Sequence, residues 1–441
     1  MPTQKFKVII VGSGLTGLVT AHALDAAGID YIILEQRSDI LFDEGGLIAL
    51  APEVLRICHQ LGLWEKMQQI GFEYFARSTF TMDGKHQDSE SFQYIRNNTG
   101  TTVWGFHRAE LMKVMFDSLG QNKDKLLQGV RLSEIITSES GVKAVCKDGR
   151  TFEGDMILGT DGVRSTVRSL MIDLARKADP ADTVWRDEKP YPAHYRAAFF
   201  YCPPVGPSGM LCETNQKDRT AFHFTSPERS YVVAMEKRTE PSIDTYQDYS
   251  EQQTDEMVEQ FNEYPVMEGF KVKDLYARKV QPAVILNIQE GIAAKWSWGG
   301  RIVLAGDSCH KLTPNTGSGC NCATQDVAVL VNGLHQLLQS QKDGTKPDSA
   351  QLAKVFEDYQ TARFDLANDQ TSTSGTVLRL QLWANPIYYF VHNFLMKTWL
   401  FDYLLWNVIT PREMKQGVVL DYIRAQEPFQ GAVEWDHKIS T

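Results

Sequence analysis

The hydrophobic pattern at the start of the chain predicts a strand, a helix and a second strand. Residues 6–11 form an apolar run typical of buried parallel strands, residues 15–27 carry apolar side chains at helical spacing, and residues 31–34 form the next apolar run. Two strands joined by a helix over this length make a βαβ unit, whose strands lie parallel in one sheet. We therefore expect an α/β domain at the start of the chain.

Further elements are predicted before residue 175. Helical spacing of apolar side chains predicts helices over residues 53–61 and 108–118. Alternating or continuous apolar positions predict strands over residues 72–80, 91–104 and 151–158. We expect the first two of these strands to belong to a second sheet.

The pattern changes between residues 175 and 290, where it predicts an antiparallel sheet. Its strands are expected over residues 195–201, 221–225 and 231–236, with one helix over residues 255–264. An apolar run over residues 302–305 then predicts a return to the first sheet. A Pro-, Thr- and Gly-rich loop follows this run, and a helix is expected to start near Asn321.

A glycine-rich turn follows the first predicted strand. Gly12, Gly14 and Gly17 form the pattern G-x-G-x-x-G between that strand and the helix after it. Gly12 allows a tight turn, Gly14 lets a pyrophosphate approach the helix N-terminus, and Gly17 lets helix and strand pack closely. Glu35 ends the second strand, where a carboxylate can accept hydrogen bonds from both ribose hydroxyls. An acid at this position indicates bound FAD or NAD rather than NADP.

These elements predict an α/β fold with a discontinuous, Rossmann-like dinucleotide-binding domain. An antiparallel-sheet substrate domain is inserted in it, and a hydrophobic helical segment follows at the C-terminus. We assign to the dinucleotide-binding domain residues 1–75, 105–174 and 291–375. Residues 76–104 supply strands of the substrate sheet, residues 175–290 form the substrate domain, and residues 376–441 form the C-terminal segment.

Residues 380–411 are apolar and rich in aromatic side chains, with Lys397 and Asp402 as the only charged residues. Pro386 and Lys397 interrupt this stretch, so it lacks the clean run of about 20 apolar residues that a membrane span needs. A helical cap packed on the dinucleotide domain is the favoured interpretation. An interfacial helix pair contacting a membrane surface is the next, and a transmembrane span is the least favoured.

Composition narrows the function further. A chain of 441 residues with 43% hydrophobic and 23% charged residues is typical of a globular enzyme with more than one domain. Its net charge of -10 disfavours nucleic-acid binding, which needs a basic face. Seven cysteines, an odd number, and no secretory signal indicate reduced thiols. We expect an intracellular protein, cytoplasmic or peripherally attached to a membrane, and not a secreted one.

Four segments together resemble the FAD-dependent monooxygenases of the p-hydroxybenzoate hydroxylase type (group A), in the branch that serves fungal secondary metabolism. They are VIIVGSGLTGLVTAHALDAAGIDYIILEQR from residue 8, FHRAELMKVMFDSL from residue 106, LGTDGVRSTVRSLM from residue 158 and GDSCHKLTPNTGSG from residue 306. Their order and spacing cover about three-quarters of the chain. The resemblance implies bound FAD, with NADPH or NADH as a transient co-substrate and dioxygen as a second one.

The resemblance also implies roles for individual residues. Arg37 belongs to the E-x-R motif, Arg108 would contact the FAD phosphates, and Asp161 belongs to the D-G motif. Asp307 would bond the FAD ribitol, which suits a carboxylate delivered by a buried strand. The turn from Gly317 to Cys320 would face the flavin ring. The expected FAD-binding residues are therefore Gly12, Gly14, Gly17, Glu35, Arg37, Ala49, Arg108, Asp161, Asp307, Gly317, Gly319 and Cys320.

The chain departs from the family pattern at two places beside the flavin. The family has G-Q-G-A-N where this chain has Gly317-Ser318-Gly319-Cys320-Asn321, and G-A-S-I-G where it has residues 45–49. Both changes keep small or flexible residues, so FAD binding is still expected. The segment 195–236 matches the family too weakly to assign a catalytic acid or base.

Two other motifs are interpreted as structural. Cys309, His310, Cys320 and Cys322 lack the paired spacing of structural zinc sites, so we expect buried thiols and no metal. Residues 296–298 share W-x-W with the flavin halogenases but lack the Ile-Pro that completes that signature. A packed aromatic corner is the favoured interpretation of this tripeptide.

The expected reaction is a monooxygenation. By the resemblance, NAD(P)H reduces FAD, dioxygen forms a C4a-hydroperoxyflavin, and one oxygen atom passes to an electron-rich carbon. Epoxidation of a prenyl or polyene alkene in a large apolar natural product is the favoured reaction. The alternatives are aromatic or indole hydroxylation, isoprenoid reduction, flavin-dependent halogenation and, least favoured, flavin binding without catalysis.

Overall fold

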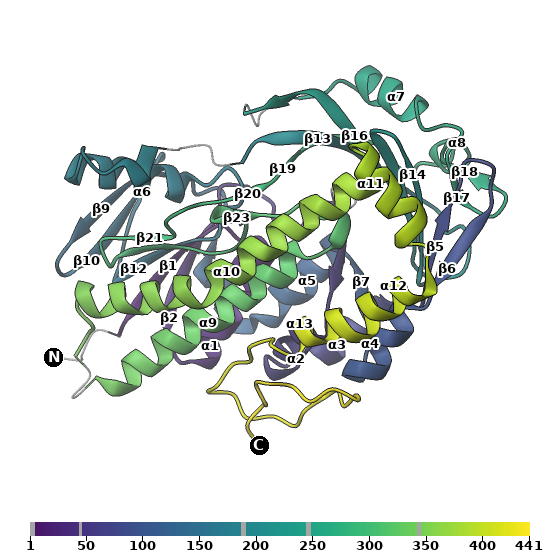
Figure 1. Ribbon diagram of the computed structural model, residues 1–441. Coiled ribbons are helices and arrows are strands. Elements are labelled where there is room, and N and C mark those ends of the chain that lie inside the picture. Colours follow the sequence, from purple (N-terminus) through teal and green to yellow (C-terminus); the bar gives the residue numbers. More distant parts are fainter. Residues whose placement is uncertain (1–4, 44–45, 187–190, 244–247, 342–344) are drawn as a thin grey trace.

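A six-stranded sheet forms the centre of the first domain in the computed structural model (Figure 1). The structure describes residues 5–43, 46–186, 191–243, 248–341 and 345–441. In spatial order the strands are β21 (Ser297–Trp298), β22 (Ile302–Leu304), β12 (Met156–Gly159), β1 (Lys7–Val11), β2 (Asp30–Leu34) and β8 (Leu126–Leu127). All neighbours pair in parallel except β21 and β22. The expected βαβ unit and the return of the chain near residue 302 are therefore confirmed.

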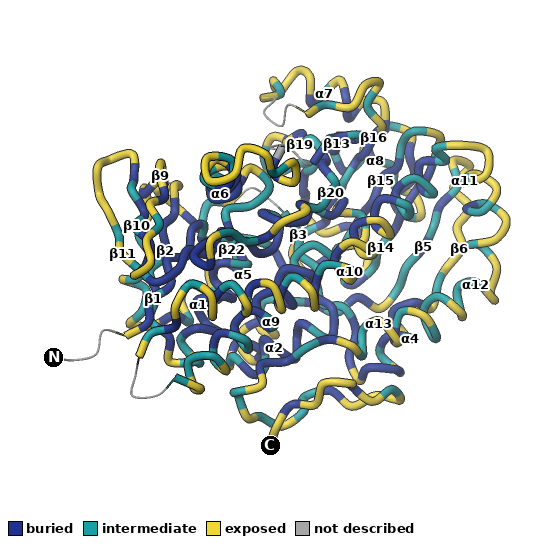
Figure 2. The backbone as a smooth tube through the Cα atoms, turned by 60° about the vertical axis from the view of Figure 1, so that its left-hand side comes forward, coloured by how far each residue is buried: buried dark blue, intermediate teal, exposed yellow. Residues whose placement is uncertain are grey.

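Helices cover this sheet, so its central strand is buried on both faces. Val8, Ile9 and Ile10 are inaccessible to solvent, which explains the continuous apolar run in β1. Helix α1 (Leu15–Ala26) packs against α9 (Gly319–Ser340), and α9 packs against α10 (Ser349–Gln381). Figure 2 shows this buried centre in dark blue. The predicted helices over residues 53–61 and 108–118 are confirmed as α2 (Pro52–Gln60) and α5 (Arg108–Ser118).

A seven-stranded sheet forms the second layer. Its order is β19 (Val284–Gln289), β13 (Ala193–Cys202), β16 (Ser230–Ser242), β15 (Arg219–Thr225), β14 (Met210–Gln216), β5 (Ala76–Phe80) and β6 (His86–Ser89). The three strands expected between residues 195 and 236 are present. Strand β14 was not predicted, because Glu213, Thr214 and Asn215 give it a polar sequence although all three are buried. Helices α7 (Glu251–Glu259) and α8 (Val272–Tyr276) cover one face of this sheet.

The structure corrects the prediction of a strand over residues 91–104. Residues Ser91–Thr99 form helix α4, and only Trp104–His107 form a strand, β7. The buried side chains of Phe92, Ile95 and Thr99 lie three and four residues apart, which is helical spacing. Gly100 ends the helix in the left-handed conformation, with φ of 84°.

Four further boundaries differ from the prediction. Residues 72–80 form two strands, because β4 (Gly71–Glu73) pairs with β7, beside β3 (Leu47–Leu50), whereas β5 joins the large sheet. Residues 151–158 also divide, since β11 (Thr151–Gly154) lies with β9 (Leu132–Ser138) and β10 (Gly141–Cys146) in a small antiparallel sheet. The helix expected over residues 255–264 is α7, which begins earlier in the chain because Ser250 caps its N-terminus. The long helix expected near Asn321 begins at Gly319.

The C-terminal segment is a series of short helices. They are α11 (Pro386–Phe390), a π-helical turn (Val391–Leu395), α12 (Trp399–Leu404), a second π-helical turn (Leu405–Ile409) and α13 (Thr410–Met414). Helices α12 and α13 contact α4 (Figure 1). In β6, the Ser89 hydroxyl donates to Asp402 and the Gln87 amide donates to the Lys397 carbonyl. The expected start of the segment at residue 376 lies inside α10. No helix in the described part of the chain is long and apolar enough to span a bilayer.

Candidate functional site

The glycine turn after β1 has the geometry of a dinucleotide cradle. A Cβ on Gly12, whose φ is 100°, would lie 2.7 Å from the Thr160 carbonyl oxygen, and one on Gly17 would lie 2.1 Å from the Gly12 carbonyl oxygen. These two glycines are therefore required by the backbone itself. A Cβ on Gly14 would meet no atom within 4 Å in the described part of the chain. Open space at Gly14, beside the N-terminus of α1, fits an approaching pyrophosphate.

Glu35 lies at the end of β2 with its carboxylate turned to the glycine turn. One oxygen accepts hydrogen bonds from the backbone and hydroxyl of Ser13, both at 2.8 Å, and the other accepts from the Arg37 backbone at 2.8 Å. The Arg37 guanidinium lies 4.3 Å from the centre of the Phe42 ring. This buried carboxylate borders the glycine turn, where the sequence predicts the ribose.

Arg108 begins α5 and lies against the segment that follows the E-x-R motif. Its backbone N–H donates to the Gly46 carbonyl at 2.8 Å, and its Cδ would be 3.5 Å from a Cβ on Gly46. Gly45, the first residue of that segment, lies outside the described residues. The structure thus brings the second motif beside β3, which carries Ala49.

Asp161 is used within its own loop. Its carboxylate accepts hydrogen bonds from the Ser165 hydroxyl at 2.5 Å and the Val167 backbone at 3.0 Å, which holds the start of α6 (Thr166–Ala178). Its Cα would lie 2.8 Å from a Cβ on Gly12, so the D-G motif borders the glycine turn. Arg168 then bonds the Ser308 carbonyl and connects this loop to the G-D motif.

Asp307 and the turn at Gly317 meet β3 at one place. The Asp307 carboxylate, which pairs with Lys311, lies 4.0 Å from the Cβ position of Gly319 at the start of α9. A Cβ on Gly317, which is left-handed with φ of 66°, would lie 3.1 Å from the Ala49 Cβ. Residues from opposite ends of the dinucleotide domain therefore border one site.

Asn321 joins the two sides of this site and was not predicted as a site residue. Its amide oxygen accepts from the Ala51 backbone at 2.9 Å, and its amide nitrogen donates to the Ala49 and Gly317 carbonyls at 3.0 and 2.9 Å. The last residue of the G-x-G-x-N turn was a signal for this role. A side chain that bonds both the β3 segment and the Gly317 turn fixes the backbone expected to face the flavin.

The thiol of Cys320 lies beside this turn. Burial raises its pKa to about 12, and the nearby Asp307 carboxylate acts in the same direction. The thiol is therefore neutral near pH 7 and is a poor nucleophile. This property agrees with a contact made by the backbone of Cys320 rather than by its sulfur.

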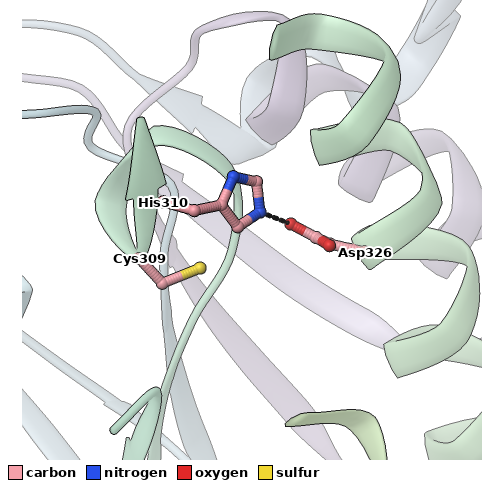
Figure 3. A group of neighbouring side chains, drawn as sticks. All are labelled: Cys309, His310 and Asp326. Atoms are coloured by element: carbon pink, nitrogen blue, oxygen red, sulfur yellow. Dashed lines mark hydrogen bonds and ion pairs between the residues drawn. The ribbon is translucent and has the colours of Figure 1, made fainter. Parts of the chain in front are cut away.

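A buried ion network supports the G-D turn from below (Figure 3). Asp326 accepts from His310 Nε2 at 2.5 Å, from Arg363 Nε at 2.9 Å and from the Gly306 backbone at 3.0 Å. Burial alone would lower the pKa of His310, but the Asp326 carboxylate raises it well above its usual value. The imidazole is therefore cationic near neutral pH, and the carboxylate lies between two cations.

Cys309 lies close to this network. Its Sγ, a ring nitrogen of His310 and a carboxylate oxygen of Asp326 all lie within 4.8 Å of one another. The Cys309 thiol donates to the Gly306 carbonyl at 3.4 Å, and burial raises its pKa well above the usual value. Because Asp326 already binds two cations and an amide, the cluster is built as an ion pair that holds Gly306. Spacing in the sequence cannot relate residue 310 to residues 326 and 363.

The sheet of the second layer presents an apolar face to the first domain. Half-buried Phe199, Leu211, Phe224 and Val233 lie on the same face as residues that pack against Leu378 and Leu382 of α10. Leu211, Phe224 and Ala49 all pack against the buried cluster of Phe72, Tyr74, Phe92 and Ile95. The apolar face and Ala49 of the expected flavin site therefore border the same cluster.

A polar group borders this face. His107, which precedes Arg108, bonds the Tyr231 hydroxyl through Nδ1 at 3.0 Å and lies 3.0 Å from an Asp43 oxygen through Nε2. The Tyr201 hydroxyl donates to the same Asp43 oxygen at 3.4 Å. These residues were not predicted, because they come from four separate segments and from no shared motif.

Comparison with known proteins agrees with this geometry. A family model described as "FAD binding domain" matches residues 5–351. FAD-dependent monooxygenase olcE of Penicillium canescens is 31% identical over 86% of this chain and 82% of its own length. FAD-dependent monooxygenase DEP2 of Fusarium langsethiae is 32% identical over 85% of this chain and 73% of its own length.

The chain belongs to the FAD-dependent monooxygenases. The expected family, cofactor, fold class and class of reaction are thereby confirmed. Two solved structures share the fold. Klebsiella pneumoniae HpxO with FAD and uric acid has a TM-score of 0.69 at 19% identity, covering 93% of this chain and 92% of its own. CtdE with FAD and a substrate also has a TM-score of 0.69, at 17% identity, covering 87% and 92%.

Substitutions of Gly14 and Gly17 should have separable effects on this monooxygenase. Gly14→Ala should keep the thermal stability of the apoprotein but weaken FAD binding, because its methyl group enters the space expected for the pyrophosphate. Gly17→Ala should destabilise the protein by about 1–3 kcal/mol, because its methyl group overlaps the Gly12 carbonyl. Thermal unfolding and FAD titration of both apoproteins measure the two effects. Equal loss of stability in both variants would contradict this assignment.

Asp307→Ala should weaken FAD binding roughly a hundredfold, since charge-assisted hydrogen bonds contribute about 1.5–3 kcal/mol each. Cys320→Ala should retain bound FAD, because only the backbone at this position is expected to face the flavin. The FAD content after gel filtration and the dissociation constant of the reconstituted apoprotein measure both. Loss of FAD from Cys320→Ala would show that the thiol itself contributes to the site.

Proposed function

We propose that this monooxygenase epoxidises a prenyl or polyene double bond in a large apolar natural product, as a step of secondary metabolism. The observation that carries the proposal is the apolar sheet face beside the expected flavin site. Phe199, Leu211, Phe224 and Val233 offer no charge and no hydrogen-bonding group. Such a face suits an alkene chain, which is held by shape and by burial of its apolar surface.

FAD supplies oxygen activation when it is bound and has been reduced by NADPH or NADH. The protein contributes binding and electrostatics. The amides of the glycine turn and Glu35 hold the dinucleotide, and Asp307 holds the ribitol. Helix α9 begins at Gly319 with no acidic side chain in its first turn, so its N-terminus stabilises negative charge on a reduced flavin.

Transfer of oxygen to an alkene requires no side chain to remove a proton from the substrate. The apolar face therefore has to orient the double bond and exclude water. Hydroxylation of a phenol or indole is the second candidate, and the pair formed by His107 and Tyr231 favours it. That pair borders the same face and could polarise a substrate hydroxyl.

The purified protein should carry FAD that NADPH bleaches, and a farnesylated substrate should accelerate this reduction. With ¹⁸O₂ the product should gain one labelled oxygen and lose one double bond. Matched assays with indoles, phenols and added halide test the hydroxylase and halogenase alternatives, and anaerobic assays test the reductase. Substrate-stimulated NADPH oxidation without any oxygenated product would count against a monooxygenase of either class.

We also propose that the C-terminal segment binds a membrane surface. Half of the exposed large apolar side chains of the described chain lie within residues 387–409, including Ile387 at 72% and Trp399 at 73% exposure. Counting histidine as neutral, Lys397 and Asp402 are the only charged residues of this stretch. Short amphipathic helices with exposed aromatic side chains are typical of interfacial binding.

Flotation with phosphatidylcholine vesicles tests this second proposal. The protein should float with the vesicles, and adding salt should change the bound fraction little, because the segment carries no net charge. Ile387→Glu with Trp399→Glu should abolish binding, whereas Val280→Glu, at a similarly exposed apolar position elsewhere, should not. A concentration-dependent dimer without vesicle binding would instead assign this surface to a second copy of the chain.

A further inference from the structure

A cavity of about 300 Å³ lies between the edge of the seven-stranded sheet and the C-terminal helices. One wall consists of β5, β6 and β14 and includes Arg77 and Glu213. The opposite wall comes from α12 and the π-helical turns and includes Trp399 and Trp406. No residue of the four FAD motifs lines the cavity, so FAD binding does not account for it.

Glu213 forms the floor of the cavity and is only 4% exposed. Its oxygens accept hydrogen bonds from Arg77 Nη2 at 3.1 Å, from the Thr79 hydroxyl at 3.0 Å and from the Gln381 amide at 3.0 Å. Burial alone would raise the pKa of Glu213, but the Arg77 guanidinium lowers it below the ordinary value. This carboxylate is therefore ionised and its acceptor positions are filled by the protein.

Arg77 retains donors that point to no protein group. Only Nη2 is engaged, and within the described ranges no acceptor bonds Nε or Nη1 of this half-buried side chain. Because Glu213 offsets the guanidinium charge, these donors suit a neutral acceptor such as a carbonyl oxygen. Besides this pair, Asp88, Glu90 and Asp402 line the cavity together with a single lysine, Lys397, so the lining carries excess negative charge and disfavours an anionic ligand. The ring of Trp406, 5.7 Å from Arg77 Cζ, offers a flat apolar contact.

The cavity and the apolar face beside the expected flavin site lie on the same side of the seven-stranded sheet. Leu211 and Glu213 lie two residues apart on β14, so their side chains share one face of the sheet. Trp406, Leu211 and Ala49 all pack against one buried cluster, which consists of Phe72, Tyr74, Phe92 and Ile95. In addition, Gln381, whose amide nitrogen bonds Glu213, accepts a hydrogen bond from Asn315 through its amide oxygen at 3.2 Å. Asn315 lies in the turn directly before Gly317.

We propose that this cavity binds the far end of the substrate and that this end carries a neutral, planar carbonyl group. Arg77 donates to the carbonyl oxygen, and the tryptophan wall covers its flat face. The alkene of the same molecule then lies along Leu211 and Phe224 towards the flavin. Only this last placement rests on the proposed epoxidation.

The test uses two probes that share one isoprenoid chain. Farnesylacetone ends in a neutral ketone, and farnesylacetic acid ends in a carboxylate. Titrated calorimetrically into FAD-loaded protein without NADPH, the ketone should bind at least about tenfold tighter. Arg77→Met should weaken ketone binding about tenfold, as expected for one lost hydrogen bond to a charged donor. Glu213→Gln should shift the ratio of the two affinities about tenfold towards the acid, because Arg77 is then no longer neutralised.

Arg219→Met is the matched control. Arg219 belongs to the same sheet and also pairs with a glutamate, Glu236, but it neighbours Thr220, whose hydroxyl bonds Asn215 on the cavity face. It therefore projects from the opposite face, and both affinities should stay unchanged. Thermal unfolding and FAD content establish that each variant is folded. If Glu213→Gln does not fold, Trp406→Leu replaces it, and this variant should bind the ketone more weakly than the wild-type protein does.

Two results of the binding experiment would overturn the proposal. One is failure of the folded wild-type protein to bind the ketone, and the other is unchanged binding in both Arg77→Met and Trp406→Leu. The oxygenation assay separates this result from the proposed function. Arg77-dependent ketone binding without oxygenation would reject only the epoxidation. Oxygenation with a KM that is insensitive to Arg77→Met would reject only the distal site.

Discussion

The parallel pairing of β1, β2, β12 and β22 is the constraint on which the flavin site depends. Parallel strands direct their carboxyl ends to the same edge of a sheet, and ligands bind at that edge. Here those ends carry Gly12, Glu35, Asp161 and Asp307, from both halves of the chain. The insertion of a whole sheet between β12 and β22 leaves this arrangement intact, because β22 returns to pair directly with β12.

A second constraint holds the turn that carries Asp307. Burying Asp326 would be costly if it lacked partners, but His310, Arg363 and the Gly306 amide satisfy it. The network spans the turn, helix α9 and helix α10. Rigid support below the turn and the Asn321 bonds above it leave little freedom to the backbone at Gly317, so the surface expected to face the flavin is organised by the protein itself.

The second sheet carries the surface that we propose for the substrate. Its apolar face borders the same buried cluster as Ala49, and its edge forms a polar cavity with the C-terminal helices. Glu213 and Arg77 lie on adjacent strands that are far apart in the sequence, and Gln381 from α10 completes the group. In this proposal the general chemistry resides in one domain and the choice of substrate in the contacts between three segments.

The sequence by itself determined the parts of the protein that depend on local pattern. The βαβ unit, the glycine turn, Glu35, helix α5 and Asp307 are each specified by residues close together in the chain. The sequence pattern predicted the wrong element where the burial of a segment depends on a distant partner. Residues 91–104 are the example, because the C-terminal segment covers the buried face of the helix that they contain. The pattern also could not place β14, whose polar residues are buried only because other segments satisfy them.

Only the tertiary structure decided which distant residues meet. The bonds of Asn321 to β3, the ion pair between His310 and Asp326, the contact of His107 with Tyr231, and the pairing of Arg77 with Glu213 all join separate elements. Hydrogen bonds and ion pairs act over a few ångströms, whereas sequence spacing constrains neighbours along one element. Strand pairing and helix packing set these distances, and so the residues expected to select the substrate emerged only from the folded chain.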